Sequence, residues 1–135
     1  MLDPSDVPPV ATDELLTRFV LFPAHVRNSD NTVKQDAFMP HPRVELSLTR
    51  HLHATDEELW REGERVAKLR TRPLHGRAFV LANAFTDEGL SVEAKPIIPE
   101  NPNHVDVVYW PADKAAQKMK AVQIAAKATY VPKPK

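Results

Sequence analysis

The sequence predicts an α+β fold, with a mostly antiparallel sheet of four to five strands and two helices packed on one face of that sheet. Three observations lead to this class. Segments with the two-residue period of strands outnumber the helical segments. A hairpin-like pair of strands lies between the two helices. The regular alternation of strands and helices with glycine-rich turns, typical of nucleotide-binding parallel sheets, is missing from the sequence.

Length and composition fit one globular domain. The chain has 135 residues, 42% of them hydrophobic and 27% charged, which are ordinary values for a globular protein. Thirteen prolines against three glycines indicate extended connections and few left-handed turns. We expect a flexible proline-rich lead-in over residues 1–12, a single domain over 13–130 and a flexible tail over 131–135.

Composition also indicates where in the cell the protein is expected and which kinds of site it lacks. The sequence has no cysteine, which excludes disulfides, thiolate metal ligands and a cysteine nucleophile. It has no run of 18 apolar residues, and "MLDPSDVPPV" has neither the basic nor the apolar part of a secretory signal. We therefore expect a cytoplasmic protein that does not insert into a membrane.

The first half of the chain predicts two strands and a helix. Residues 15–22 are rich in branched and aromatic side chains, as strands are, and 23–43 have loop composition. Over 44–51, apolar and polar residues alternate with the period of a half-buried strand. A capping box of Thr55 and Glu58 then begins a helix that ends before Pro73. Gly63 in the middle of this helix indicates close packing against the sheet.

The second half predicts a hairpin, a strand and a second helix. Residues 77–85 are almost continuously apolar, so we expect a central strand there, joined by a turn to a strand over 90–94. The alternation over 104–110 indicates a further strand. A helix follows from Asp113 to about Ala128, and its core-facing residues are expected to be Ala115, Met119, Val122 and Ala126.

Polar side chains concentrate at the end of the strand over 44–51. The strand period places Glu45, Ser47, Thr49 and His51 on one face, while Arg50 has the phase of the apolar face but lies at the strand end, where its head group can leave the core. Such a face can present a ligand site. It is also what the solvated side of any amphipathic strand looks like.

Two loops that precede strands carry similar chemistry. If "LHGR" (74–77) and "NPNH" (101–104) lie beside the end of the 44–51 strand, they complete a cluster suited to an anionic ligand, because arginine binds oxyanions and histidine titrates near neutral pH. The expected ligand-binding residues are Arg50, His51, His75, Arg77, Asn103 and His104. In the alternative interpretation the asparagines are turn residues and the arginines pair with surface carboxylates.

A metal site is a weaker interpretation of the same region. In "HLH" the residues His51 and His53 are spaced to share one face of a strand, an arrangement that can bind Zn²⁺. The candidates for a third ligand, among them His41, are scattered along the sequence. We therefore expect no metal and no cofactor.

The sequence resembles a family of small bacterial proteins with motifs of the form ELSVTRH, GRA and NPNH…WPADK. The stretches that carry the resemblance are "VKQDAFMPHPRVELSLTRH", "LHGRA" and "NPNHVDVVYWPADKAAQK", and together they cover most of residues 18–130. Leu48 stands where the family pattern has valine, a harmless exchange in a strand. The resemblance implies a cytosolic, bacterial-type domain, and it supplies no reaction.

Two functional hypotheses follow from the sequence. The first is a small domain that binds an anionic or nucleotide-like ligand through the Arg/His cluster, and it leaves open whether the domain is an enzyme. The alternative is a non-catalytic component of a multi-protein bacterial system that binds a protein partner through a sheet edge or the acidic N-terminal segment. That segment, residues 1–17, has four carboxylates and no lysine or arginine. A nucleic acid ranks below both, because the lysines between Lys114 and Lys127 sit on a helix whose other face is expected to be buried. The sequence leaves the oligomeric state open.

Overall fold

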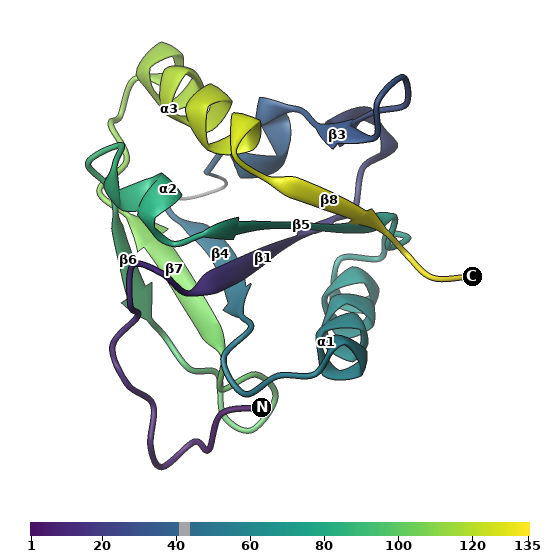
Figure 1. Ribbon diagram of the computed structural model, residues 1–135, viewed down its shortest axis with the longest axis vertical. Coiled ribbons are helices and arrows are strands. Elements are labelled where there is room, and N and C mark those ends of the chain that lie inside the picture. The colour runs from purple at the N-terminus through teal and green to yellow at the C-terminus, as the bar shows by residue number, and fades with distance from the viewer. Residues whose placement is uncertain (41–43) are drawn as a thin grey trace.

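The structure is a computed structural model that describes residues 1–40 and 44–135. Its centre is a six-stranded antiparallel sheet, with a small two-stranded ribbon beside it (Figure 1). In sheet order the strands are β6 (Ser91–Ala94), β7 (His104–Val108), β4 (Leu46–Arg50), β1 (Leu15–Val20), β5 (Gly76–Leu81) and β8 (Thr129–Pro132), and the ribbon is β2 (Val26–Arg27) with β3 (Thr32–Val33). The predicted α+β class is confirmed, but the main sheet has six strands instead of the predicted four to five.

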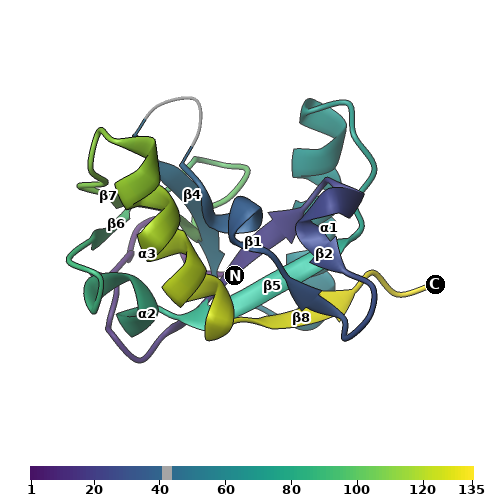
Figure 2. The same cartoon turned by 90° about the horizontal axis from the view of Figure 1, so that it is seen from above.

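Two main helices cover the sheet, α1 (Asp56–Leu69) and α3 (Lys114–Ala126), and α2 (Asn83–Thr86) is a single turn. Adjacent residues of a strand point to opposite faces. On β1, Leu16 and Val20 enter the main core beneath α3, whereas Phe19 packs against the residues of α1. The helices therefore lie on opposite faces of the sheet, well separated in Figure 2, and the prediction that both pack on one face is wrong. Within the described residues, no helix is long and apolar enough to cross a membrane.

The start of α1 follows the predicted capping box. Thr55 accepts a hydrogen bond from the backbone N–H of Glu58, and the Glu58 side chain accepts one from the backbone N–H of Thr55. Gly63 then faces Phe19 of β1, and a Cβ at this position would lie 2.9 Å from the Phe19 ring. Close packing thus explains the glycine, because any larger side chain would push α1 away from β1.

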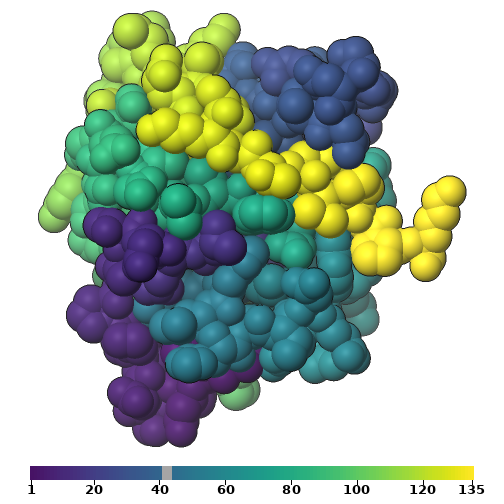
Figure 3. Space-filling model, in the orientation of Figure 1, coloured from purple at the N-terminus to yellow at the C-terminus, as the bar shows by residue number. Residues whose placement is uncertain are grey.

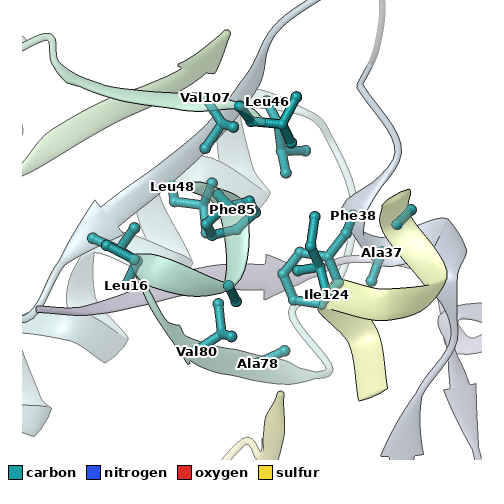
Figure 4. Packing of buried hydrophobic residues seen from close by; sticks show 14 of the residues in the cluster. Leu16, Ala37, Phe38, Leu46, Leu48, Ala78, Val80, Phe85, Val107 and Ile124 are labelled. Atoms are coloured by element: carbon teal, nitrogen blue, oxygen red, sulfur yellow. The ribbon is translucent and has the colours of Figure 1, made fainter. Parts of the chain in front are cut away.

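The main core lies between the sheet, α2, α3 and the 3₁₀ turn at Gln35–Phe38 (Figure 4). The predicted inner face of α3 is wrong. The helix buries Gln117, Ala121 and Ile124, while Met119 is 73% exposed and Val122 is 42% exposed. Small and apolar residues occur on both sides of this helix, so their spacing alone does not select a face. The contact with Ala37 and Phe38 selects it.

The predicted hairpin over 77–94 is also wrong. The strand β5 ends at Leu81, and residues 83–86 form α2 instead of continuing it. β5 then pairs with β1 and β8, whereas β6 pairs with β7 at the other edge of the sheet. α2 buries Ala84 and Phe85 in the core. The apolar stretch over 77–85 therefore contains the end of a strand and a buried helical turn, which hydrophobicity alone does not distinguish.

Both predicted terminal segments contact the domain. Leu2 is buried, its backbone N–H donates to the Asn103 side chain, and the N-terminal segment lies along the body of the molecule (Figure 3). At the other end β8, which we did not predict, includes Val131 and Pro132 from the expected tail. Its ladder with β5 explains why Gly76 has no room for a Cβ, since Val131 and Tyr130 pack directly on it.

The two central strands, β1 and β4, separate along their length. β1 pairs with β5 through six residue pairs but with β4 through only two, Leu16 with Arg50 and Thr17 with Thr49. Beyond these pairs the strands diverge, as Figure 1 shows from the different slopes of β1 and β4. One end of the β1–β4 pair is therefore closed by backbone hydrogen bonds, and the other is open.

Candidate functional site

A cavity of about 480 Å³ lies at the open end of the β1–β4 pair. It is bounded by α1, by β1 and the turn that follows it, by β4, and by the loop that leads into β7. Its volume falls in the range of small-molecule sites. Charged side chains line two parts of its wall, and neutral polar and apolar side chains line the rest.

Arg18 is the main cation of the cavity. Its Nε donates to the Ala37 carbonyl at 3.1 Å, and its Nη1 donates to the Ser47 carbonyl at 2.9 Å, across the gap where a β1–β4 ladder would have continued. Among the described residues no carboxylate lies within salt-bridge distance of Arg18. Burial, and secondarily the charge of Arg70, lower the pKa of the Arg18 guanidinium to about 10. Arg18 therefore remains charged at neutral pH without a counterion.

Arg70 and His25 complete this cationic end. Arg70 is the C-terminal capping residue of α1 and lies at the exposed rim. His25 belongs to the 3₁₀ turn at Pro23–His25, directly after β1. Burial lowers the His25 pKa, Asp36 raises it, and the charges of Arg18 and Lys34 lower it further. Burial and the nearby charges of Arg18 and Lys34 therefore favour the neutral imidazole, and an anion that enters the cavity would favour the protonated form.

The second charged part of the wall consists of two carboxylates and one guanidinium that interact with one another. On α1, Glu62 is 4% exposed and accepts two hydrogen bonds from Arg65, at 2.8 and 2.5 Å. Glu100 also interacts with Arg65, and together with Glu62 it raises the pKa of that guanidinium. Because two carboxylates surround one cation, this side of the cavity does not attract a second anion.

The sheet side of the cavity carries neutral hydrogen-bonding groups. Asn101 is buried and donates from its amide to Thr49 Oγ1 at 3.1 Å. His104 Nδ1 lies 2.8 Å from the Lys95 carbonyl, so this nitrogen carries the proton and Nε2 points toward Asp106 at 3.6 Å. Ser47 Oγ donates to the same carboxylate at 3.2 Å. Serine therefore contacts the aspartate instead of the histidine, which is not the order of a nucleophilic triad.

Arg50 and Asn103, both predicted to bind a ligand, are structural. Arg50 is fully buried, and its guanidinium binds both carboxylate oxygens of Glu14, at 2.8 and 2.6 Å, and the carbonyls of Pro8 and Pro9. Asn103 donates to the carbonyls of Arg50 and Leu52. The expectation that the Arg50 head group leaves the core is wrong, because the N-terminal segment folds over the strand end and supplies its acceptors.

His51 and Arg77 lie together, as predicted, but away from the cavity. Arg77 Nη1 donates to Thr17 Oγ1 at 3.1 Å, and His51 Nε2 lies 2.5 Å from the same oxygen and 3.5 Å from Arg77 Nη1. Burial, and then the Arg77 charge, lower the His51 pKa to about 4, so the imidazole is neutral and its Nε2 accepts. Asp56 contacts Arg77 at 3.3 Å and pairs its charge, while Arg77 Nε is a buried donor without a partner in the described part of the chain.

The remaining predicted residues divide between structure and cavity. His75 is partly buried, its backbone pairs with Val20, and its Nε2 is a buried atom without a partner in the described part of the chain. His104 alone among the six predicted residues lines the cavity. The three polar motifs therefore do not converge on one pocket: they form a buried ion pair, a buried polar cluster and one wall of the cavity.

Sequence reasoning missed the cationic end of the cavity. Arg18 lies inside the apolar run "LLTRFVLF". A charged residue in an otherwise buried strand is unusual, and this was the feature that could have indicated a site. Arg70 lies at the end of α1, where a basic residue suits the helix dipole without any binding site. Neither position predicts a site until the divergence of β1 from β4 is known.

The metal interpretation gains no support. The strand ends at Arg50, so "HLH" is not extended, and His53 is exposed with a φ of 56°. In the two described segments, 1–40 and 44–135, there is no group of three potential metal ligands. His41, one candidate third ligand, lies outside the described residues.

Comparisons of this chain with protein-family models, with curated proteins and with solved structures found no match.

Proposed function

We propose that this domain binds a small anionic ligand in the cavity at the open end of the β1–β4 pair. The observation that carries the proposal is Arg18. It is a partly buried guanidinium that lines a cavity, donates only to two backbone carbonyls and has no carboxylate partner among the described residues. Taking a charge out of water costs free energy unless an opposite charge offsets it. A bound anion is the partner that this geometry lacks.

The neighbours of Arg18 strengthen this assignment. Arg70 adds a second cation close enough to lower the Arg18 pKa, and two like charges beside a cavity are unfavourable until an anion bridges them. Fork-shaped guanidinium groups recognise carboxylates and phosphates through paired hydrogen bonds. Arg18 Nη2 makes no hydrogen bond within the described residues and is available for this contact.

Thermal unfolding with small anions tests the proposal. Wild-type protein and Arg18→Gln are heated with acetate, octanoate, inorganic phosphate or adenosine monophosphate at constant ionic strength. We expect at least one anion to raise the midpoint of the wild type in a saturable manner, and the shift to disappear in Arg18→Gln, because a ligand that binds only the folded state stabilises it.

The matched control is Arg61→Gln. Arg61 lies on α1 but pairs with Glu57 on the exposed surface and does not line the cavity. It should keep the full ligand-dependent shift. An equal shift in Arg18→Gln, or the absence of a saturable shift with every anion, would contradict the proposal.

A protein partner is the second candidate, and the open edges of the sheet favour it. Within the described residues β6 and β8 each pair with one neighbouring strand only, so both edges have backbone groups that an added strand can bind. The acidic N-terminal segment is less available, because Glu14 is engaged by Arg50. A stoichiometric partner that is released when Ala94 of β6, whose N–H faces away from β7, is replaced by proline would support this candidate.

A further inference from the structure

We infer that the ligand is an organic monocarboxylate: one carboxylate, held by Arg18, carried on an apolar body that fills the space between α1 and the sheet. This inference rests on the proposed function and adds the chemical class of the ligand. It depends on the charge of the cavity, the kind of anion-binding groups present and the nature of the remaining wall.

The fixed charges of the cavity suit a single negative charge. Three arginines and two glutamates line it, a net charge of plus one, and one of the arginines is already bound by Glu62. The free positive charge is therefore confined to the Arg18 and Arg70 end. A ligand with several negative charges would have to place some of them beside Glu62 and Glu100, where they are repelled.

The groups that usually bind phosphate chains do not face this cavity. None of the three glycines lines it, so it lacks the glycine-rich loop that presents successive backbone N–H groups to phosphates. The end of α1 that reaches the cavity is its C-terminus, at Arg70, where the helix dipole is negative. Paired guanidinium donors without such a nest favour a carboxylate over a di- or triphosphate.

Much of the remaining wall is apolar, and part of it is exposed to solvent. Phe19 and Leu48 line it from the sheet, and Val66 from α1. Leu69 and Phe22 stand at the mouth, where Leu69 is 72% and Phe22 is 36% exposed. Exposed apolar side chains scattered singly need no explanation, but these gather around one cavity. An apolar ligand body would remove them from water.

The length of α1 sets the size of that body. Arg70 is five residues beyond Arg65 and eight beyond Glu62, which corresponds to roughly 7 to 12 Å along a helix axis. A carboxylate at the cationic end therefore has room for a medium-length acyl chain or an aromatic ring before the ligand reaches the balanced Glu62–Arg65 pair. Asn101 and His104 lie on that side and can bind a polar group at the far end of the ligand.

Isothermal titration calorimetry with a homologous series tests the inference. Acetate, butyrate, hexanoate and octanoate are titrated into the intact chain, with octylamine, inorganic phosphate and adenosine monophosphate as comparisons. We expect affinity to rise roughly fourfold for each methylene that contacts the wall. Octylamine, which has the same apolar body and the opposite charge, should not bind measurably.

Two variants separate the carboxylate contact from the apolar contact. Arg18→Gln should abolish octanoate binding. Leu69→Gln, at an exposed position, should weaken octanoate several-fold and leave the far weaker acetate binding unchanged.

The outcomes distinguish this inference from the proposed function. If phosphate or adenosine monophosphate binds more tightly than octanoate and needs Arg18, the anion site stands and the monocarboxylate inference is wrong. If octanoate binds Arg18→Gln or if octylamine binds as well as octanoate, the association is only hydrophobic and both proposals are wrong. No binding by any of these compounds also contradicts both.

Discussion

Arg50 and Arg18 lie on the two central strands of one sheet, but only Arg50 has a carboxylate partner in the described chain. Arg50, at the closed end of the β1–β4 pair, is fully buried, and its guanidinium is satisfied by a carboxylate and two carbonyls. Arg18, at the open end, donates to two carbonyls and has no carboxylate partner in the described chain. The closed end uses its polar groups to hold the fold together, whereas the open end leaves charge available.

This difference shows that the type of residue does not distinguish a structural cluster from a binding site. Both ends contain arginine, histidine, asparagine and a carboxylate. At the closed end each guanidinium is paired with a carboxylate of the same chain, Arg50 with Glu14 and Arg77 with Asp56, so no charge there needs a ligand to offset it. Charge complementarity within the chain, and not the density of polar residues, therefore identifies the functional candidate.

Breaking the closed end should have the largest effect. Arg50→Met leaves Glu14 without its partner in a nearly buried position and removes two contacts to the N-terminal segment. Removing one partner of a buried ion pair typically costs about 3–5 kcal/mol, so we expect a loss of that size in the free energy of unfolding measured by urea denaturation.

The double variant Arg50→Met/Glu14→Leu is the control for this ion pair. It should recover a large part of the loss, because the uncompensated carboxylate is gone. A cost below about 1 kcal/mol for Arg50→Met would mean that the pair does not hold the strand end.

The polar cluster at the closed end should make stability depend on pH through His51. Folding lowers the pKa of this imidazole from 6.5 to about 4, so the unfolded chain binds the proton more tightly. The stabilisation is therefore complete above pH 6.5 and is lost as the pH falls from 6.5 toward 4. After allowance for partial exposure, we expect His51 to account for about 2 kcal/mol of that loss.

Urea denaturation of wild type and His51→Gln across this pH range isolates the effect. The free energy of unfolding of His51→Gln should fall less steeply between pH 6.5 and 4.5 than that of the wild type. Parallel curves would show that another group is responsible for the pH dependence.

Replacing the open-end arginine should change stability little. Arg18→Gln removes a charge that burial and Arg70 make unfavourable, and the loss of one or two hydrogen bonds offsets that gain. We expect the free energy of unfolding to change by less than about 1 kcal/mol in urea denaturation without ligand. A loss as large as that of Arg50→Met would make Arg18 structural and would remove the contrast between the two ends.

The smallest expected effect is a pH dependence of anion binding through His25. Its pKa is lowered by burial and by the Arg18 and Lys34 charges, against the opposing effect of Asp36, and a bound anion should raise it. Binding then takes up a proton, so octanoate affinity should increase roughly two- to fivefold as the pH falls from 7.5 to 5.5. Calorimetry with His25→Gln should show a flat profile, and an unchanged slope would exclude His25 as the titrating group.

Local signals in the sequence predicted much of the fold. The capping box of α1, the alternation around Leu46 and Leu48, and the close approach at Gly63 each depend on a few neighbouring residues, and all three are present in the structure. The pairing of β5 and β6 and the buried face of α3 were predicted wrongly. Both depend on contacts between segments far apart in the sequence, such as the packing of Phe38 against Phe85.

The candidate site was harder to predict for the same reason. Of the six residues expected to bind a ligand, only His104 lines the cavity. Arg50 and Asn103 could not be distinguished from ligand-binding residues by sequence, because the N-terminal segment that contacts both is brought to them by the fold. Arg18 was missed because its strand has an apolar composition. Its importance comes from the divergence of two strands, which is a property of the sheet and not of either segment.

The contrast between the two arginines can be tested directly by ¹⁵N NMR of their side chains. The Nε–H resonances of Arg18 and Arg50 are assigned with the Arg18→Gln and Arg50→Lys variants and followed while octanoate is added to the wild type. We expect the Arg18 signal to shift in a saturable manner and the Arg50 signal to stay where it is. An unchanged Arg18 signal, or a shift of Arg50 instead, would contradict the assignment of the open end as the binding site.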